Sequence, residues 1–97
     1  MTEKHYAEVE KLGSDMLSLL ADAYSTGDPS SELAQRAAAL HRSWLSCYMD
    51  NYSKEIHAGL TQMYVDDPRF TAYYDKKQPG TATFLRDAIL IYTGMKN

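Results

Sequence analysis

The stretch from Leu60 to Asp75 constrains the fold more than any other part of the 97-residue chain. Asp67 precedes Pro68, and this pair is typical of a helix N-cap followed by a proline at the first helical position. Because a proline disfavours the α conformation of the residue before it, one helix must end near Asp66 and another must begin at Pro68. Apolar and aromatic residues recur at spacings of three and four on both sides of this corner. Two short helices joined so tightly must fold back onto a shared core.

The hydrophobic pattern along the rest of the chain predicts an all-α, compact bundle of about five helices. The predicted helices span residues 4–24, 29–48, 54–65, 68–77 and 81–93. Asp28 and Ser53 are the expected N-caps of the second and third helices, with Pro29 as the first residue of the second. Gly94 and Lys96 suit the end of the last helix. The sequence contains no strand pattern and no internal repeat.

The composition is that of one small globular domain over residues 1–97, and it argues against several functions. The chain is 44% hydrophobic and 24% charged, with a net charge of −3 and no basic cluster. This balance argues against a direct nucleic-acid partner. A single cysteine excludes an internal disulfide and suits a reducing cytoplasm. No apolar run approaches the roughly 18–20 residues of a membrane span, so we expect a cytoplasmic protein with no membrane partner.

The aromatic residues point to a binding cleft. The chain has eight tyrosines but two phenylalanines, and tyrosine combines a flat apolar face with a polar tip. Its rings exceed what the core of a five-helix bundle requires, so we expect some of them to line a groove for a flat, multi-ring ligand. Trp44, Tyr48 and Tyr52 are favoured because they approach the break after the second helix. The expected ligand-binding residues are Trp44, Tyr48, Tyr52, His57, Leu60, Met63, Tyr64, Phe70, Tyr73 and Tyr74.

Metal and enzyme chemistry have weaker support. His41 and His57 could suggest a metal or haem site, but no companion cysteine or histidine stands at metal-ligand spacing. We expect no metal and no cofactor, and treat each histidine as hydrogen-bonded at the edge of the core or as a donor to a ligand. Asp66, Asp67 and Asp75 could suggest paired carboxylates, but no nucleophile or base accompanies them. We therefore expect no catalytic residue and no enzyme activity.

From about Asp28 to Tyr92 the chain resembles the TipAS-type antibiotic-recognition domain. The resemblance rests on a helix that ends in Met-Tyr, then Asp-x-Arg-Phe, Tyr-Asp, Pro-Gly and a final Phe-Leu-Arg-Asp-Ala-Ile helix. The matching residues are Met63, Tyr64, Asp67, Arg69, Phe70, Tyr74, Asp75, Pro79, Gly80, Phe84, Leu85, Arg86, Asp87, Ala88 and Ile89. The resemblance implies a globin-like arrangement of helices without haem. It also implies binding of bulky hydrophobic antibiotics, thiopeptides among them, in a cleft between helices.

The resemblance implies a regulatory context as well. Such domains usually follow a winged helix-turn-helix in MerR-family transcriptional activators, and that separate domain, absent from this chain, would make any DNA contact. The chain is then expected to be an excised effector domain or a stand-alone relative that sequesters a drug. The family can capture thiopeptides through a cysteine near the break before the third helix, where this chain has Asn51, Tyr52 and Ser53. We therefore expect reversible binding here, with Cys47 as a small buried thiol.

Two alternatives concern the first helix. It can pack as a fixed part of the bundle, or it can act as a mobile lid that closes over a ligand, since Gly13 interrupts it.

An alternative function is also open, in which the whole chain is a helical protein-interaction or dimerisation module without a small-molecule ligand. The sequence leaves the oligomeric state open.

Overall fold

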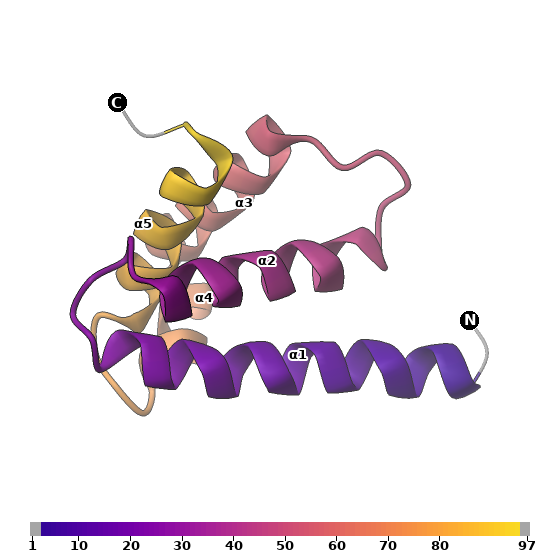
Figure 1. Ribbon diagram of the computed structural model, residues 1–97, viewed down its shortest axis with the longest axis horizontal. Coiled ribbons are helices and arrows are strands. Elements are labelled where there is room, and N and C mark those ends of the chain that lie inside the picture. The colour runs from indigo at the N-terminus through magenta and orange to yellow at the C-terminus, as the bar shows by residue number, and fades with distance from the viewer. Residues whose placement is uncertain (1–2, 96–97) are drawn as a thin grey trace.

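The computed structural model describes residues 3–95 and shows five α-helices, with no strand among these residues (Figure 1). The helices are α1 (Glu3–Tyr24), α2 (Glu32–Ser46), α3 (Lys54–Asp66), α4 (Pro68–Asp75) and α5 (Thr81–Thr93). This arrangement confirms the predicted all-α bundle. Lys96, expected near the end of the last helix, lies outside the described residues. No helix in the described part of the chain is both long enough and apolar enough to cross a lipid bilayer.

Side-chain caps fix the starts of α3 and α4 as the sequence predicts. Ser53 Oγ accepts a hydrogen bond of 3.0 Å from the backbone N–H of Ile56. Asp67 Oδ1 accepts one of 2.9 Å from the backbone N–H of Arg69, with Pro68 at the start of α4. Each cap satisfies a backbone donor that has no partner within the helix.

The predicted bounds of the second helix were wrong at both ends. Asp28 Oδ1 accepts a hydrogen bond from the backbone N–H of Ser30, at 2.9 Å, and so stabilises a turn before the helix. Ser31 is the N-cap instead, and α2 begins at Glu32. The helix also ends earlier than expected, at Ser46. Both Asp28 and Ser31 have cap chemistry, and the tertiary fold selects the later one.

The turn between α4 and α5 is fixed by hydrogen bonds from two sides. The carboxylate of Asp75 accepts hydrogen bonds from the backbone N–H groups of Gly80 and Ala82, at 3.1 and 2.8 Å. Gly80 has φ +95°, a conformation that favours glycine. The Tyr24 hydroxyl donates to the carbonyl oxygen of Pro79 at 2.6 Å. The end of α1 is therefore fastened to this turn.

The core lies where α1, α2 and α5 meet. α1 and α2 run antiparallel along each other, and α3 packs beside α5 (Figure 1). Small residues on α2 let its neighbours approach closely, and larger apolar side chains from α1 and α5 fill the space. The central buried residues are Met16, Leu20, Ala23, Ala34, Ala37, Ala38, Leu85, Ala88 and Ile89. The N-terminal part of α1 extends beyond the end of α2 (Figure 1).

Candidate ligand-binding groove

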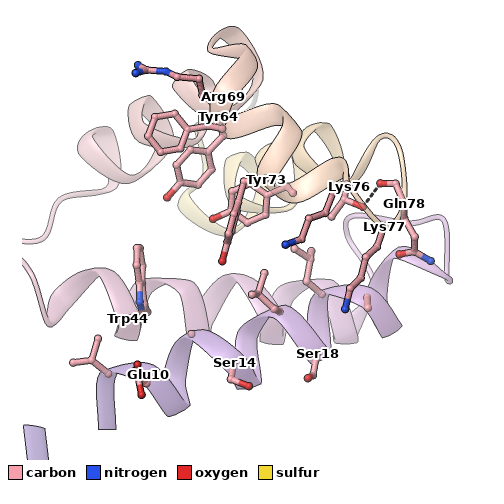
Figure 2. A pocket seen from close by; sticks show the side chains of 18 of the residues that line it. Glu10, Ser14, Ser18, Trp44, Tyr64, Arg69, Tyr73, Lys76, Lys77 and Gln78 are labelled. Carbon is pink, nitrogen blue, oxygen red and sulfur yellow. Dashed lines mark hydrogen bonds between the residues drawn. The ribbon is translucent and has the colours of Figure 1, made fainter. Parts of the chain in front are cut away.

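A groove of about 1280 Å³ separates α1 from α4, with the C-terminal part of α2 at one end (Figure 2). Its volume exceeds the range of about 300–1,000 Å³ that is common for drug-sized ligands. Most of the side chains that line it are aromatic, aliphatic or small. A cleft of this size and lining suits a large apolar molecule.

The α4 side of the groove is an aromatic wall. Phe70, Tyr73 and Tyr74 stand at spacings of three and four on this short helix. Tyr64 of α3 stacks on Phe70 and contacts Tyr74, with ring centres 5.5 and 5.0 Å apart. The Thr71 hydroxyl donates to the carbonyl oxygen of Tyr64 at 2.6 Å and so holds the corner between the helices. Tyr74 is buried, whereas the side chain of Tyr73 is 52% exposed and free to stack on a ligand.

The α2 side of the groove is formed by Trp44 and Tyr48. Their rings meet edge to face with centres 5.1 Å apart. Trp44 also lies against Gly13 of α1, where an added Cβ would stand 3.4 Å from the indole nitrogen. Gly13, which the structure places within the continuous helix α1, is therefore the place where the indole approaches the α1 backbone. Tyr48 is 59% exposed at the groove mouth.

A buried chain of polar side chains runs behind these walls. Tyr52 Oη lies 2.6 Å from His57 Nδ1, and His57 Nε2 lies 2.8 Å from His41 Nδ1. His41 Nε2 then lies 3.3 Å from Tyr64 Oη. Both histidines are 0% exposed, and their rings stack with centres 5.0 Å apart. The chain links the α2–α3 loop to the aromatic wall of the groove through hydrogen bonds alone.

This packing holds both histidines in the neutral form. Burial is the main cause that lowers the pKa of His41 to about 3, and the neighbouring His57 lowers it further. Burial also lowers the pKa of His57 to about 4, with a smaller contribution from the Arg42 guanidinium. The hydrogen bond between the two rings needs one nitrogen without a proton, so it too favours neutral imidazoles.

The structure brings six of the ten expected ligand-binding residues into the groove. They are Trp44, Tyr48, Tyr64, Phe70, Tyr73 and Tyr74. The other four lie elsewhere. Tyr52 and His57 belong to the buried polar chain, Leu60 packs against the core, and Met63 is exposed outside the groove lining.

The sequence raised the possibility that the first helix closes over a ligand, but none of the ten expected binding residues lies on α1. Along the groove this helix contributes Tyr6, Val9, Glu10, Gly13, Ser14, Leu17, Ser18, Leu20 and Ala21. Part of this helix packs into the bundle, where Val9 and Leu20 are buried. The signal that could have identified the wall is the neighbouring stripe of small side chains, Ser14, Ser18 and Ala21, which leaves space beside the core.

Cys47 and the acidic residues add no reactive centre to the groove. Cys47 is half-buried at the end of α2, where its thiol donates to the carbonyl oxygen of Ser43 at 3.4 Å, and it does not line the groove. Within residues 3–95, no group of three or more His, Cys, Asp or Glu side chains is placed to hold a metal ion.

Comparison with known proteins gives one consistent set of relatives. The TipAS antibiotic-recognition domain matches residues 1–92. The HTH-type transcriptional activators TipA of Streptomyces coelicolor and of Streptomyces lividans are each 32% identical over 90 residues, which is 92% of this chain and 36% of the relative. The HTH-type transcriptional activator mta of Bacillus subtilis is 36% identical over 58 residues, 60% of this chain and 23% of the relative. No solved structure matches the chain significantly.

The chain thus spans little more than a third of the length of the TipA relatives, while the domain match covers almost all of the chain. The aromatic groove lies within the matched residues. The chain belongs to the TipAS antibiotic-recognition domain family.

Proposed function

We propose that this domain binds bulky hydrophobic antibiotics, thiopeptide-like molecules among them, in the groove between α1 and α4. The observation that carries the proposal is the aromatic lining of a groove of about 1280 Å³. Rings stacked against a flat ligand contribute about 0.5–1.5 kcal/mol per pair beyond the burial of apolar area. Binding is reversible and non-catalytic in this proposal, since the side chains that line the groove include hydroxyl and amine groups but no cysteine thiol.

The domain acts as the effector-sensing part of a MerR-type transcriptional regulator, or as a stand-alone relative that sequesters drug. Membership of the TipAS family and the names of its relatives, which are HTH-type transcriptional activators, support this context. In a full-length regulator a separate winged-helix domain makes the DNA contacts. This chain carries the ligand specificity in either case.

Part of the groove is preformed and part can close. Tyr74 and Trp44 are held by the packed bundle, whereas Val9 is the single buried side chain among residues 5–12 of α1. A ligand that contacts Tyr6 and Leu17 buries exposed apolar surface of α1 and thereby stabilises its closed position. This is the lid expected from the sequence, restricted to the N-terminal part of the helix.

A thermal-shift screen against thiopeptides and other large aromatic antibiotics tests the proposal. A ligand present at about 100 times its dissociation constant stabilises the folded state by about 2.7 kcal/mol. Trp44 is the one tryptophan of the chain and lines the groove, so the same ligands should change its fluorescence. A hit that raises the melting temperature but leaves Trp44 fluorescence unchanged binds elsewhere and contradicts the assignment of the site.

Substitutions at the rim give a sharper test. Tyr48→Ala and Tyr73→Ala each remove an exposed ring from the groove, and we expect each to weaken binding by about tenfold, or about 1.4 kcal/mol. Ile56→Ala is the matched control, because Ile56 is 48% exposed on α3 and lies outside the groove lining. Equal affinities of all three variants and the unchanged protein would show that the ligand does not use this groove.

The competing function is a helical interaction or dimerisation module. The exposed apolar side chains Tyr6, Leu17, Tyr48, Phe70 and Tyr73 all border the groove, so a partner helix is the alternative occupant. Sedimentation analysis separates the two functions. A concentration-dependent dimer that is insensitive to every antibiotic in the screen supports the interaction module.

A further inference from the structure

The charges along the groove have an uneven distribution. The whole chain has a net charge of −3, yet the charged residues that line the groove are Glu10, Arg69, Lys76 and Lys77. Figure 2 shows Glu10 near Trp44 at one end and both lysines near the α4–α5 turn at the other. The two lysines are therefore together at one end of the groove, whereas Glu10 lies toward the other end and Arg69 lies beside Tyr64 (Figure 2).

No carboxylate of residues 3–95 forms an ion pair with the lysines at this end. Asp67 pairs with Arg69, with Oδ2 and Nη2 2.9 Å apart, so the arginine charge is compensated. Asp75 directly precedes the lysines, but its two oxygens accept the backbone N–H groups of Gly80 and Ala82. Both oxygens of Asp75, the carboxylate nearest in sequence, thus bind the backbone at the start of α5 and not a lysine.

The two lysines keep their charge available to a ligand. Lys76 Nζ lies 5.7 Å from the ring centre of Tyr73, which is an aromatic and not an acidic partner. Neither Lys76 nor Lys77 forms an ion pair with another of the residues 3–95. Both side chains are exposed, and Ser18, the labelled α1 residue on the lysine side of the groove in Figure 2, carries no charge.

We propose that Lys76 and Lys77 form an anion-reading end of the groove, so that its preferred ligands are aromatic molecules with a carboxylate or sulfonate at one end. The rings lie against Trp44 and Tyr73, and the acidic group lies against the two ammonium groups. This inference rests on the proposed function, because it assigns a ligand class to the same groove. An exposed ion pair changes affinity by at most about fivefold, so the lysines select among aromatic ligands and do not replace stacking as the source of affinity.

A pair of fluorescent probes isolates the effect of the anion. Anilinonaphthalene sulfonate carries a sulfonate, and phenylnaphthylamine has the same ring system without it. Energy transfer from Trp44, the sole tryptophan, reports binding of either probe close to the groove. For Lys76→Gln/Lys77→Gln we expect the affinity for the sulfonate probe to fall by up to about fivefold for each lysine removed at low ionic strength, with the affinity for the neutral probe unchanged.

Salt and charge reversal extend the test. Added salt at about 0.1 M shortens the screening length to about 10 Å, so it should weaken binding of the sulfonate probe to the unchanged protein more than to the double variant. Lys77→Glu should weaken binding of that probe more than Lys77→Gln does. Lys54→Gln is the matched control, since Lys54 is an exposed lysine at the start of α3, outside the groove lining.

The outcomes separate this inference from the proposed function. Two results would contradict the anion-reading end and leave the groove assignment intact. In the first, the double variant loses affinity for both probes equally or for neither. In the second, Lys54→Gln lowers the affinity for the sulfonate probe as much as the double variant does. If neither probe nor any screened antibiotic changes Trp44 fluorescence, the groove itself is wrong. The inference is supported if the double variant, but not Lys54→Gln, loses affinity for the sulfonate probe and keeps its affinity for the neutral probe.

Discussion

His41 and His57 are completely buried in the chain of hydrogen bonds that joins the α2–α3 loop to Tyr64. A second proton on either ring would place a charge in an apolar interior, and two charged rings together would leave no acceptor for the hydrogen bond between them. The residue-scale consequence is that the fold depends on two histidines remaining neutral, although the ordinary pKa of histidine lies near neutrality.

This dependence predicts acid lability. The pKa values in the folded protein are about 3 for His41 and about 4 for His57, below the ordinary 6.5. Above about pH 7.5 the histidines are neutral in both states, whereas at lower pH the unfolded chain takes up protons that the folded protein excludes. The free energy of unfolding should therefore fall between about pH 7.5 and about pH 5, by about 2 kcal/mol for each histidine.

Urea unfolding followed by Trp44 fluorescence at the two pH values measures this loss. Nitrogen chemical shifts of the imidazoles provide an independent check, since both buried rings should keep neutral shifts at about pH 5 in the folded protein. A free energy of unfolding that stays flat across this range, or charged rings in the folded protein, would contradict the assignment.

At the scale of elements, the starts of α3, α4 and α5 agree with the sequence prediction, whereas the start of α2 does not. The Asp67-Pro68 corner and the Ser53 cap are determined by residues next to one another, so sequence alone identified them. Before α2 the chain offers two caps, and Asp28 stabilises a turn while Ser31 caps the helix. The choice depends on how α2 packs on α1, which no local pattern records.

Substituting two glycines by alanine compares the energetic effect of glycine inside a helix with its effect at a helix end. Gly59 lies inside α3 and Gly94 is the C-cap of α5 with φ +75°, and neither has an atom within 4 Å of an added Cβ. Gly59→Ala should stabilise the domain by about 1 kcal/mol through helix propensity. Gly94→Ala should destabilise it by about 1 kcal/mol, because alanine is strained in the left-handed region.

Thermal unfolding of the two variants measures this contrast. For a domain of this size a change of 1 kcal/mol shifts the melting temperature by about 4–8 °C, so the two shifts should be resolved and opposite in sign. A destabilised Gly59→Ala would contradict the open space that surrounds Gly59 in the structure.

At the scale of the whole molecule, the groove results from elements far apart in sequence. The number of aromatic residues indicated a cleft, and their positions in the sequence identified its α2 and α4 walls. Neither step needs tertiary information. The α1 wall and the burial of His57 could not be predicted in this way. Both depend on which face of a helix packs against α2 and which face remains open. Only the tertiary packing determines this orientation.

The same packing predicts that α1 has two parts of unequal stability. Met16, Leu20 and Ala23 anchor its C-terminal part in the core, and the Tyr24 hydroxyl fastens its end to Pro79. Among residues 5–12 the single buried side chain is Val9. Amide hydrogens of residues 5–12 should therefore exchange faster than those of residues 16–24 in the free protein.

Hydrogen exchange with and without the tightest-binding antibiotic of the thermal-shift screen tests whether this difference serves binding. A ligand held between α1 and α4 adds contacts to the poorly anchored part, so exchange should slow most for residues 5–12. The buried amides of α5 are the internal control, since α5 is anchored by Leu85 and Ile89 in both states. Equal protection along α1 in the free protein would mean that the groove is a rigid slot. Its ligands would then be selected by shape and charge alone, because no part of α1 would remain to adapt to them.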